Sequence, residues 1–259
     1  MTDRSALVTG STSGIGLSIA RTLADAGYGI LLNGFGDADE IETLRQEMEA
    51  THGVPVRYNG ADISNPEACD ALIAQGDDEL GGIDVLVNNA GIQHTARAED
   101  FPLKRWQAVI DVNLSGAYYC IRAAVPGMRE REHGRIINIA SAHGLVASPE
   151  KVAYVSAKHG LVGMTKVVAL ENSDLDITCN AICPGWVLTP LVQKQIEDKA
   201  EREGVSVEEA EHDLLAEKQP MTRFTQPEDI GHMALYLASD AARTVTGATL
   251  SIDGGWTAR

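Results

Sequence analysis

The sequence lacks long apolar runs and paired cysteines. None of its runs approaches the roughly 20 apolar residues of a membrane span. The N-terminal stretch MTDRSALVTG reaches an expected strand too early for a secretory signal, so we expect a cytoplasmic protein. The cysteines form no CxxC motif and accompany no histidine cluster. We therefore expect reduced, mostly buried thiols and no metal site; the cysteines are Cys69, Cys120, Cys179 and Cys183.

Basic residues are also scarce. The 259 residues include 21 Lys and Arg against 37 Asp and Glu, giving a formal net charge of −16. Nucleic acids and anionic membranes require a basic protein surface, so the charge argues against both as partners. Any anionic substrate must be captured by a local cluster of donors that works against the field of the whole protein.

Short aliphatic runs alternate with amphipathic helical patterns along the chain. The helical pattern after the first run, for example, carries Ile15, Ile19 and Leu23 on one face. Near-continuous apolar strands between such helices indicate a parallel sheet covered on both faces. We predict an α/β fold: one domain with a doubly wound, Rossmann-type sheet of about seven strands. The expected strands lie within residues 5–10, 28–34, 54–62, 83–91, 134–141, 176–185 and 247–255.

One charged segment interrupts this alternation. Residues 187–222 are longer than a simple return from helix to strand requires. They contain two helical patterns, and the second begins with Ser206 and Glu209 in capping-box spacing. Insertions near strand ends commonly cover active sites. We predict a helical substrate lid within the single domain, with a solvated surface decoration as the alternative.

A glycine-rich turn, TGSTSGIG, follows the first strand and begins the first helix. Gly10, Gly14 and Gly16 allow the backbone to turn tightly and to approach a ligand closely. The helix N-terminus then presents unpaired N–H groups to a pyrophosphate. The spacing differs from the commoner G-x-G-x-x-G pattern, but its place after the first strand of an alternating chain predicts a dinucleotide site.

The stretch AYVSAKHGL places Tyr154 four residues before Lys158. On a helix these side chains share one face. A neighbouring cation favours the ionised phenol, so the spacing predicts a lowered Tyr154 pKa and a proton-transfer group. A chance spacing on a solvated helix is the alternative that this pair alone leaves open.

Together these motifs resemble the short-chain dehydrogenase/reductase family. The glycine turn is followed in order by NNAG at 88–91, NLSG at 113–116, a strand-end serine, YVSAK at 154–158 and PGWVLT at 184–189. The resemblance implies that Tyr154 is the general base and that Lys158 lowers its pKa and binds the nicotinamide ribose. It further implies that Ser141 donates to the substrate oxygen and that Asn113 supports Lys158 through a water. A non-catalytic nucleotide sensor, the alternative from another class, would be expected to lack some of these four.

The resemblance also implies a nicotinamide cofactor. The second strand ends in LLNGFGDAD, where no Lys or Arg stands ready for a 2′-phosphate. Asp37 comes later than the usual ribose-binding acid, and Phe35 is placed to cover the adenosine. We therefore predict NAD over NADP. The residues assigned to the cofactor are Gly10, Thr12, Ser13, Gly14, Ile15, Gly16, Phe35, Asp62, Ile63, Asn89, Gly91, Tyr154, Lys158, Pro184, Gly185, Val187 and Thr189.

Residues between the motifs must select the substrate. Gln93, His143, Lys151 and a lid glutamine, Gln195, offer several donors to a small anion. Lys151 is the i, i+3 neighbour of Tyr154, which suits a carboxylate one carbon beyond the reacting hydroxyl. Trp186 would close the apolar side around a methyl group. Each has an ordinary alternative: a solvated lysine, a loop-capping histidine, a loop glutamine or plain packing of the tryptophan.

These stretches and the ending DGGWTAR resemble the branch of the family that interconverts 3-hydroxybutyrate and acetoacetate with NAD. The resemblance implies that Gln93, His143, Lys151 and Gln195 bind the carboxylate and that the chain forms a homotetramer. The alternative within the family is an NADPH-dependent 3-oxoacyl carrier-protein reductase. Trp256 is left open between a subunit contact and a place in a neighbouring site.

Overall fold

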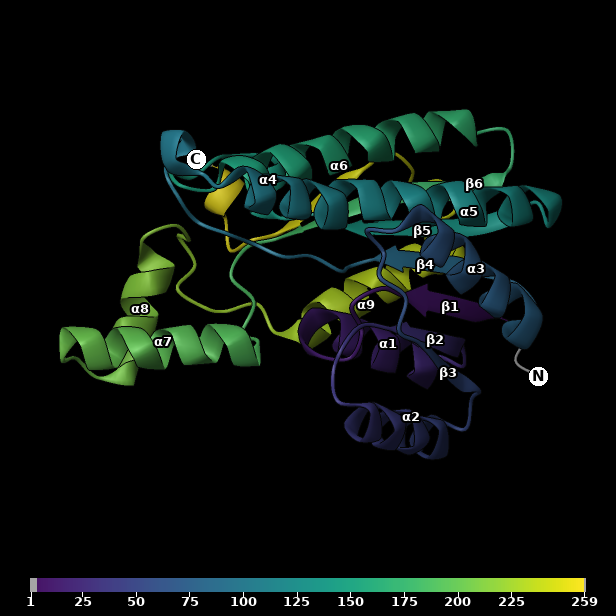
Figure 1. The fold of residues 1–259 in the computed structure, drawn as a ribbon, viewed down its shortest axis with the longest axis horizontal. Coiled ribbons are helices and arrows are strands. Elements are labelled where there is room, and N and C mark those ends of the chain that lie inside the picture. The colour runs from purple at the N-terminus through teal and green to yellow at the C-terminus, as the bar shows by residue number, and fades with distance from the viewer. Residues whose placement is uncertain (1–3, 259) are drawn as a thin grey trace.

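A computed structural model describes residues 4–258, which form a seven-stranded sheet with helices on both faces (Figure 1). The strand order is β3-β2-β1-β4-β5-β6-β7, and every neighbouring pair is parallel. The predicted α/β, doubly wound sheet is therefore confirmed. The strands are β1 (Ser5–Val8), β2 (Gly29–Asn33), β3 (Val56–Asn59), β4 (Val85–Asn88), β5 (His133–Ile139), β6 (Asp176–Pro184) and β7 (Thr249–Ile252).

Nine α-helices connect or flank these strands in the described part of the chain. Within residues 4–258, none of the helices is long and apolar enough to cross a membrane. The helices are α1 (Gly14–Asp25), α2 (Ala38–His52), α3 (Pro66–Leu80), α4 (Leu103–Ile110), α5 (Gly116–Glu130), α6 (Val152–Glu171), α7 (Pro190–Glu203), α8 (Val207–Ala216) and α9 (Pro227–Ala238).

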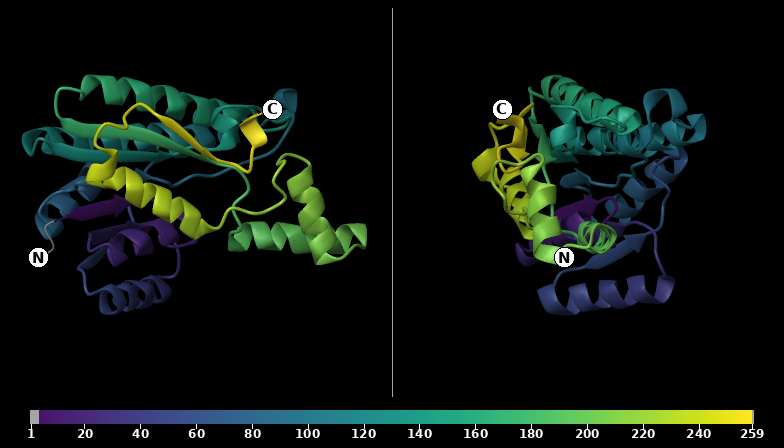
Figure 2. Two further views of the ribbon diagram at one scale, coloured as in Figure 1. Left: turned by 180° about the vertical axis from the view of Figure 1, so that it is seen from behind. Right: turned by 90° about the vertical axis from the view of Figure 1, so that its left-hand side faces the viewer.

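Side-chain alternation along the central strands builds two hydrophobic cores. In β1, Ala6 and Val8 belong to the core that contains residues of α1 and α9, whereas Leu7 belongs to the core that contains residues of α3 and α5. All three are fully buried. Successive residues of a strand face opposite sides of a sheet, so a run that is apolar throughout fills both layers. Figure 2 shows the helices on either side of the sheet.

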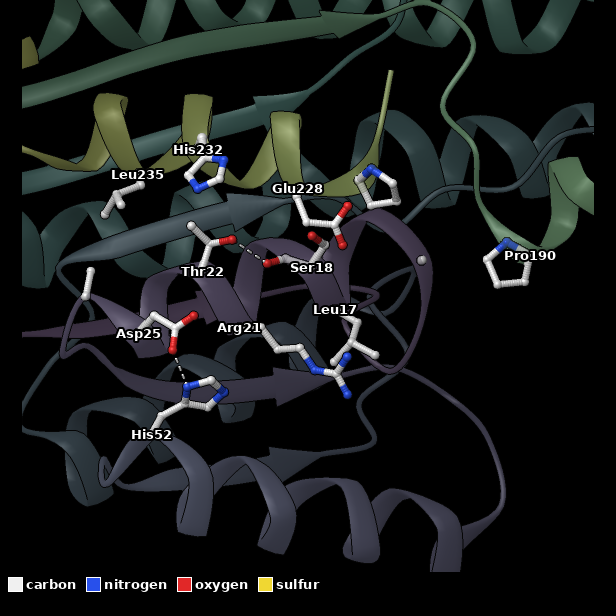
Figure 3. Close-up of a pocket in the computed structure, with 13 residues that line it drawn as sticks. Leu17, Ser18, Arg21, Thr22, Asp25, His52, Pro190, Glu228, His232 and Leu235 are labelled. Carbon is white, nitrogen blue, oxygen red and sulfur yellow. Dashed lines mark hydrogen bonds and ion pairs between the residues drawn. The ribbon is translucent and has the colours of Figure 1, made fainter. Parts of the chain in front are cut away.

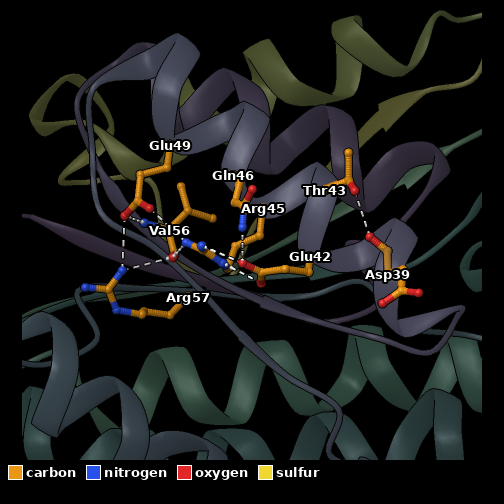
Figure 4. Close-up of polar contacts among 8 residues, drawn as sticks. All are labelled: Asp39, Glu42, Thr43, Arg45, Gln46, Glu49, Val56 and Arg57. Atoms are coloured by element: carbon orange, nitrogen blue, oxygen red, sulfur yellow. Dashed lines mark hydrogen bonds and ion pairs between the residues drawn. The ribbon is translucent and has the colours of Figure 1, made fainter.

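A charged network holds α2 against β3 (Figure 4). Arg45 donates to Val56 O at 2.9 Å and pairs with the Glu49 and Glu42 carboxylates, each at 2.8 Å. Arg57 reaches Glu49 at 3.1 Å. Hydrogen bonds from Arg45 and Gln46 lower the pKa of Glu42 to about 2. Arg45 is the first basic residue after β2, and its guanidinium is already engaged in this network.

The segment predicted to be a lid, residues 187–222, contains α7 and α8 and projects from the sheet (Figures 1 and 2). Its helices enclose a small hydrophobic core of their own, formed with Phe224 just beyond them. At its base two chain segments pair: Leu188 N donates to Thr225 O at 2.9 Å, and Thr225 N donates to Trp186 O at 3.1 Å. The lid is thus a separately packed unit joined to the body through a narrow base. Its core residues are Ile196, Ala200, Ala210, Leu215 and Phe224.

Candidate active site

The glycine turn lies at the carboxyl ends of β1 and β4, where the strand order reverses direction. Gly10 has φ +62°, and a Cβ there would lie 2.8 Å from Ala90 Cα; a Cβ on Gly16 would lie 2.2 Å from Gly10 O. Asn89 Nδ2 donates to Thr9 O at 2.9 Å and to Gly10 O at 3.0 Å. The turn is therefore locked against the β4 end, at the switch point where such sheets bind nucleotides.

The first turn of α1 is suited to an anion. Ser13, in an extended conformation, is the N-cap residue of α1. Its side chain makes no capping hydrogen bond to the helix. The same helix carries no acidic residue in its first turn. Its terminal N–H groups and the positive end of its dipole therefore face the glycine turn without a side-chain acceptor. This arrangement fits a pyrophosphate.

The segment after β2 is acidic and partly open. Phe35 is 69% exposed, and its carbonyl accepts from Thr12 Oγ1 at 3.0 Å. Asp37 caps α2 by accepting from the N–H groups of Asp39 and Glu40 at 3.0 and 3.1 Å. A 2′-phosphate placed here would meet these carboxylates and no cation from residues 34–40.

Residues expected at the adenine lie after β3. Asp62 accepts from Ser64 N at 2.9 Å and from Ser64 Oγ at 2.7 Å, which closes a tight turn. Ile63 is 7% exposed and packs so closely that a Cβ on Gly116 would lie 2.7 Å from its Cδ1. The turn is thus anchored to the start of α5.

Three predicted catalytic residues meet at the end of β5. Ser141 caps a short 3-10 helix, Ala142–Gly144, by accepting from His143 N at 3.1 Å, and its hydroxyl also hydrogen-bonds the Tyr154 phenol. Lys158 lies one turn further along α6, with Nζ 5.6 Å from the Tyr154 ring centroid. Lys158 is 4% exposed and donates to Ile139 O at 2.8 Å. A hydroxyl, a phenol and an amine therefore converge on one point.

The predicted net lowering of the Tyr154 pKa is wrong for the structure. Burial raises the pKa of Tyr154 above its ordinary value, and the Ser141 hydrogen bond only partly opposes this. Burial also lowers the pKa of Lys158 to about 8. Desolvation disfavours the charged form of both groups, an effect that sequence spacing does not reveal. In this state the phenol is a neutral acid at neutral pH.

Asn113 is positioned by an irregular turn of helix. Residues Asp111–Ser115 form a π-helical turn between α4 and α5, a feature frequent at functional sites. Asn113 Nδ2 donates to Ile92 O and Val109 O, both at 2.8 Å. Its Oδ1 is buried with no hydrogen-bond partner within residues 4–258. A Cβ on Gly91 would lie 2.6 Å from this oxygen and 3.8 Å from Lys158 Nζ, so the oxygen is an available acceptor on the Lys158 side.

An aromatic and cationic group lies beside Tyr154 through the ring of His143. The His143 ring lies 6.0 Å from the Tyr154 ring and 5.0 Å from the Trp256 ring, both edge-on. Trp186 stacks on Trp256 at 6.4 Å, and Lys151 Nζ lies 6.0 Å from the Trp186 ring. The site thus offers a cation beside an apolar wall.

The titrating groups of this wall are strongly affected by burial. Burial, followed by the charge of Lys151, lowers the pKa of His143 to about 4, and burial lowers the pKa of Lys151. His143 Nε2 lies 2.9 Å from Ser148 Oγ. His143 is therefore a neutral polar group at neutral pH, whereas the buried charge of Lys151 favours an anionic partner.

Sequence reasoning missed the place of Trp256. It is 9% exposed and completes the wall with His143 and Trp186. The chain returns to the site after β7 through residues 253–255, and Asp253 accepts from Gly255 N at 3.0 Å. Only the strand order, which places β7 beside β6, brings this residue next to the lid base.

Two predicted substrate residues stand apart from this group. Gln93 is exposed in the loop after β4, and Gln195 is exposed on α7, which projects from the body (Figure 1). By contrast, the lid base reaches the cofactor side. Thr189 caps α7 by accepting from Val192 N at 3.3 Å, and its Cγ2 would lie 3.7 Å from a Cβ on Gly14.

A groove of about 790 Å³ lies elsewhere, between α1 and α9 (Figure 3). His52 and Asp25 pair there at 2.6 Å. Gly14 is the one predicted site residue that lines it, and none of the four predicted catalytic residues does. Its other lining residues include Leu17, Ser18, Arg21, Thr22, Glu228, His232 and Leu235.

Comparison with known proteins agrees with the fold and shows the family of the chain. The family model described as enoyl-(acyl carrier protein) reductase matches residues 10–257. The chain belongs to the short-chain dehydrogenase/reductase family, a class of oxidoreductases that use nicotinamide dinucleotides.

Individual relatives cover nearly the whole chain. It is 54% identical over 99% of its length to a D-beta-hydroxybutyrate dehydrogenase of Cupriavidus necator, of which 98% is covered. It is 51% identical, with 99% of each chain covered, to a D-beta-hydroxybutyrate dehydrogenase of Rhizobium meliloti. A solved actinorhodin polyketide ketoreductase variant with NADPH is 35% identical, with a TM-score of 0.91 over 100% of this chain and 99% of its own.

Proposed function

We propose that this protein oxidises D-3-hydroxybutyrate reversibly to acetoacetate with NAD. The observation that carries the proposal is the Lys151 amine beside the Trp186–Trp256 wall, which is joined to Tyr154 by the His143 ring. A short hydroxy acid with a terminal methyl matches that pairing of cation and apolar surface. Relatives named for this activity, at 54% and 51% identity over the full length, support it.

The cofactor is held, in this proposal, along the carboxyl edge of the sheet. The glycine turn and the α1 N-terminus bind the pyrophosphate, Asp62 and Ile63 lie at the adenine, and Lys158 holds the nicotinamide ribose. The nicotinamide supplies the hydride acceptor. NAD is favoured over NADP because Asp37, Asp39 and Glu40 surround the start of α2 and would repel a 2′-phosphate.

The protein's own part in the reaction is to move one proton and to stabilise one oxygen. Ser141 donates a hydrogen bond to the substrate oxygen, and the Tyr154 oxygen takes up the hydroxyl proton while the phenol releases its own proton toward Lys158 as the alcohol is oxidised. The proton passes on past Lys158 toward solvent, through water held at Asn113 Oδ1. In the reverse direction the neutral phenol is already the form required of a general acid, which agrees with its raised pKa.

The carboxylate is bound by Lys151 and the neutral imidazole of His143, with Gln93 and Gln195 added when the lid closes. Trp186 and Trp256 exclude water from the methyl side. Because Lys151 is buried enough to have a lowered pKa, pairing with a carboxylate restores its preference for the charged form.

Absorbance at 340 nm with purified protein, NAD and D-3-hydroxybutyrate tests the proposal. We expect NADH formation that depends on the D enantiomer, with a higher kcat/KM for NAD than for NADP. No absorbance change with this substrate would contradict the activity, and a preference for NADP would contradict the cofactor assignment. Turnover of a 3-oxoacyl thioester with NADPH, in place of acetoacetate with NADH, would favour the carrier-protein reductase alternative.

We also propose a homotetramer. Val167 and Leu170 on α6 are 53% and 76% exposed, and Tyr118 on α5 is 51% exposed. Such apolar exposure on two long helices suits helix packing between subunits. Light scattering after size exclusion tests this, with four times the 27.6 kDa chain mass as the expected result.

A further inference from the structure

Lys218 lies at the C-terminal base of the lid, a position that the family motifs do not include. It follows Glu217, the C-cap residue of α8, and its backbone N–H donates to Leu215 O at 3.0 Å. Its side chain is 30% accessible and pairs with Glu217 at 2.9 Å. The residue therefore belongs to the base of the lid and not to its projecting helices.

The neighbouring Gln219 fixes this segment against the substrate wall. Gln219 is 1% exposed, and its Oε1 accepts from Trp186 N at 2.7 Å. Its Nε2 donates to Arg223 O at 3.3 Å, and a Cβ on Gly254 would lie 2.8 Å from that nitrogen. Residue 218 is thus held beside Trp186 and close to the segment that carries Trp256.

The charge of Lys218 acts on the same groups that border the substrate. Its positive charge lowers the pKa of both His143 and Lys151, while Glu217 acts on Lys151 in the opposite direction. Lys151 and Lys218 both disfavour the protonated form of His143, and Lys218 also disfavours the charged form of Lys151. An anion bound beside these groups would relieve their repulsion. In a chain with net charge −16, such a place is a local exception.

We propose that Lys218 is a specificity-determining residue that, together with Lys151, attracts the substrate carboxylate, and that Glu217 competes with that carboxylate. This inference rests on the proposed function. Lys218 is anchored through Gln219 at the base and does not stand on α7 or α8, so in this proposal its field acts on the incoming anion before the lid closes. Gln195, on the projecting helix, acts only afterwards.

Steady-state kinetics of Lys218→Gln and Glu217→Gln test the inference. Because the Lys218–Glu217 pair is partly exposed, the expected effects are modest. Lys218→Gln should raise KM for acetoacetate about two- to fivefold, and Glu217→Gln should lower it by a similar factor. For both variants kcat and the KM for the dinucleotide should stay within about twofold of wild type, and Lys218→Arg should restore the wild-type KM.

Lys199→Gln is the matched control, because Lys199 pairs with Glu203 on α7 of the same lid. It removes the same charge from the lid and should leave KM unchanged. High salt should shrink the effect of Lys218→Gln, since partly exposed charges are screened. A KM in Lys218→Gln equal to that of Lys199→Gln, or a raised KM in Glu217→Gln, overturns the inference.

Turnover by the wild-type protein distinguishes a failure of the proposed function from a failure of the proposed role of Lys218. If the wild type does not turn over 3-hydroxybutyrate or acetoacetate, the proposed function fails and this inference fails with it. If the wild type is active and Lys218→Gln has an unaltered KM, only the role of Lys218 is overturned.

Discussion

The two sides of the site differ in how the chain holds them. Ser141, Tyr154 and Lys158 stand on the end of β5 and the first turns of α6, and Lys158 is bonded directly to the last residue of that strand. Gln195 instead stands on a helical pair with its own small core. The groups proposed to handle the proton are therefore fixed by the main core, whereas part of the proposed substrate grip stands on the separate helical pair.

The difference places the proposed proton transfer on the main core and the proposed control of substrate entry on the helical pair. A preorganised hydroxyl, phenol and amine need no rearrangement when the substrate arrives, and a lid with its own core can swing as a unit about its base. The paired segments at Trp186, Leu188 and Thr225 form that base. Mutations on the two sides should then change different kinetic constants.

The largest effect is expected from Tyr154→Phe, which removes the proton-transfer group and leaves the ring. Loss of general acid–base catalysis should lower kcat by about 10²- to 10⁴-fold, with little change in the affinity for NADH. Stopped-time activity assays and titration of NADH fluorescence measure the two quantities. If the variant retains more than a tenth of the wild-type kcat, Tyr154 is not the proton-transfer group.

Next in size is Lys151→Ala, compared with Gln195→Ala. Loss of a charge-assisted hydrogen bond costs about 1.5–3 kcal/mol, so kcat/KM should fall roughly ten- to hundredfold through KM. The neutral amide of Gln195 contributes about 1 kcal/mol, so its loss should be about fivefold. Equal losses for the two variants, measured with acetoacetate, would erase the distinction between fixed and moving donors.

A smaller effect on stability is expected from Gln219→Ala. The change leaves the Trp186 N–H without its 2.7 Å acceptor, a loss of about 1–3 kcal/mol for a buried donor. The Tm should fall, and proteolysis within residues 187–222 should become faster. Gln193→Ala is the control, because its amide pairs with Glu197 on the helix surface at 2.8 Å. Indistinguishable Tm values for the two variants would contradict a buried anchor at the lid base.

The smallest effect concerns pH and His143. Its pKa is about 4 in the folded chain against about 6.5 as an ordinary value, so the unfolded chain binds the extra proton between these values. Stability should therefore fall as pH decreases from 6.5 toward 4. His143→Gln lacks this term, and the stability gap between wild type and variant should narrow on acidification. Urea unfolding at pH 7, 5.5 and 4.5 measures the gap; a constant gap would contradict the buried neutral imidazole.

Features set by local pattern were predictable from the sequence. The central strands β1, β2 and β4 are mostly apolar because both faces of the sheet are covered there. Positions 10 and 16 in the turn after β1 are glycines because neither has room for a Cβ. The spacing of Tyr154 and Lys158 likewise placed them on one helix face. These features depend on residues that are close together in the sequence, so the sequence alone is sufficient to predict them.

Features set by burial or by distant chain segments were not predictable. The Tyr154 pKa has the opposite direction to the prediction because desolvation outweighs nearby hydrogen bonding. Trp256 joins the substrate wall only because β7 lies beside β6. Gln219 reads as an ordinary surface residue in the sequence, yet its amide is buried at the lid base.

The π-helical turn at Asp111–Ser115 has a consequence for how this chain can vary. The turn accommodates one residue more than an α-helical path would, and this surplus aims the Asn113 amide at Ile92 O and leaves its oxygen on the Lys158 side. Deleting Asp111 or Val112 would rotate the Asn113 amide by about 100° around the helix axis relative to α4. In this stretch the number of amino acids is under tighter constraint than most of their identities, so point changes should be tolerated where a one-codon deletion is not.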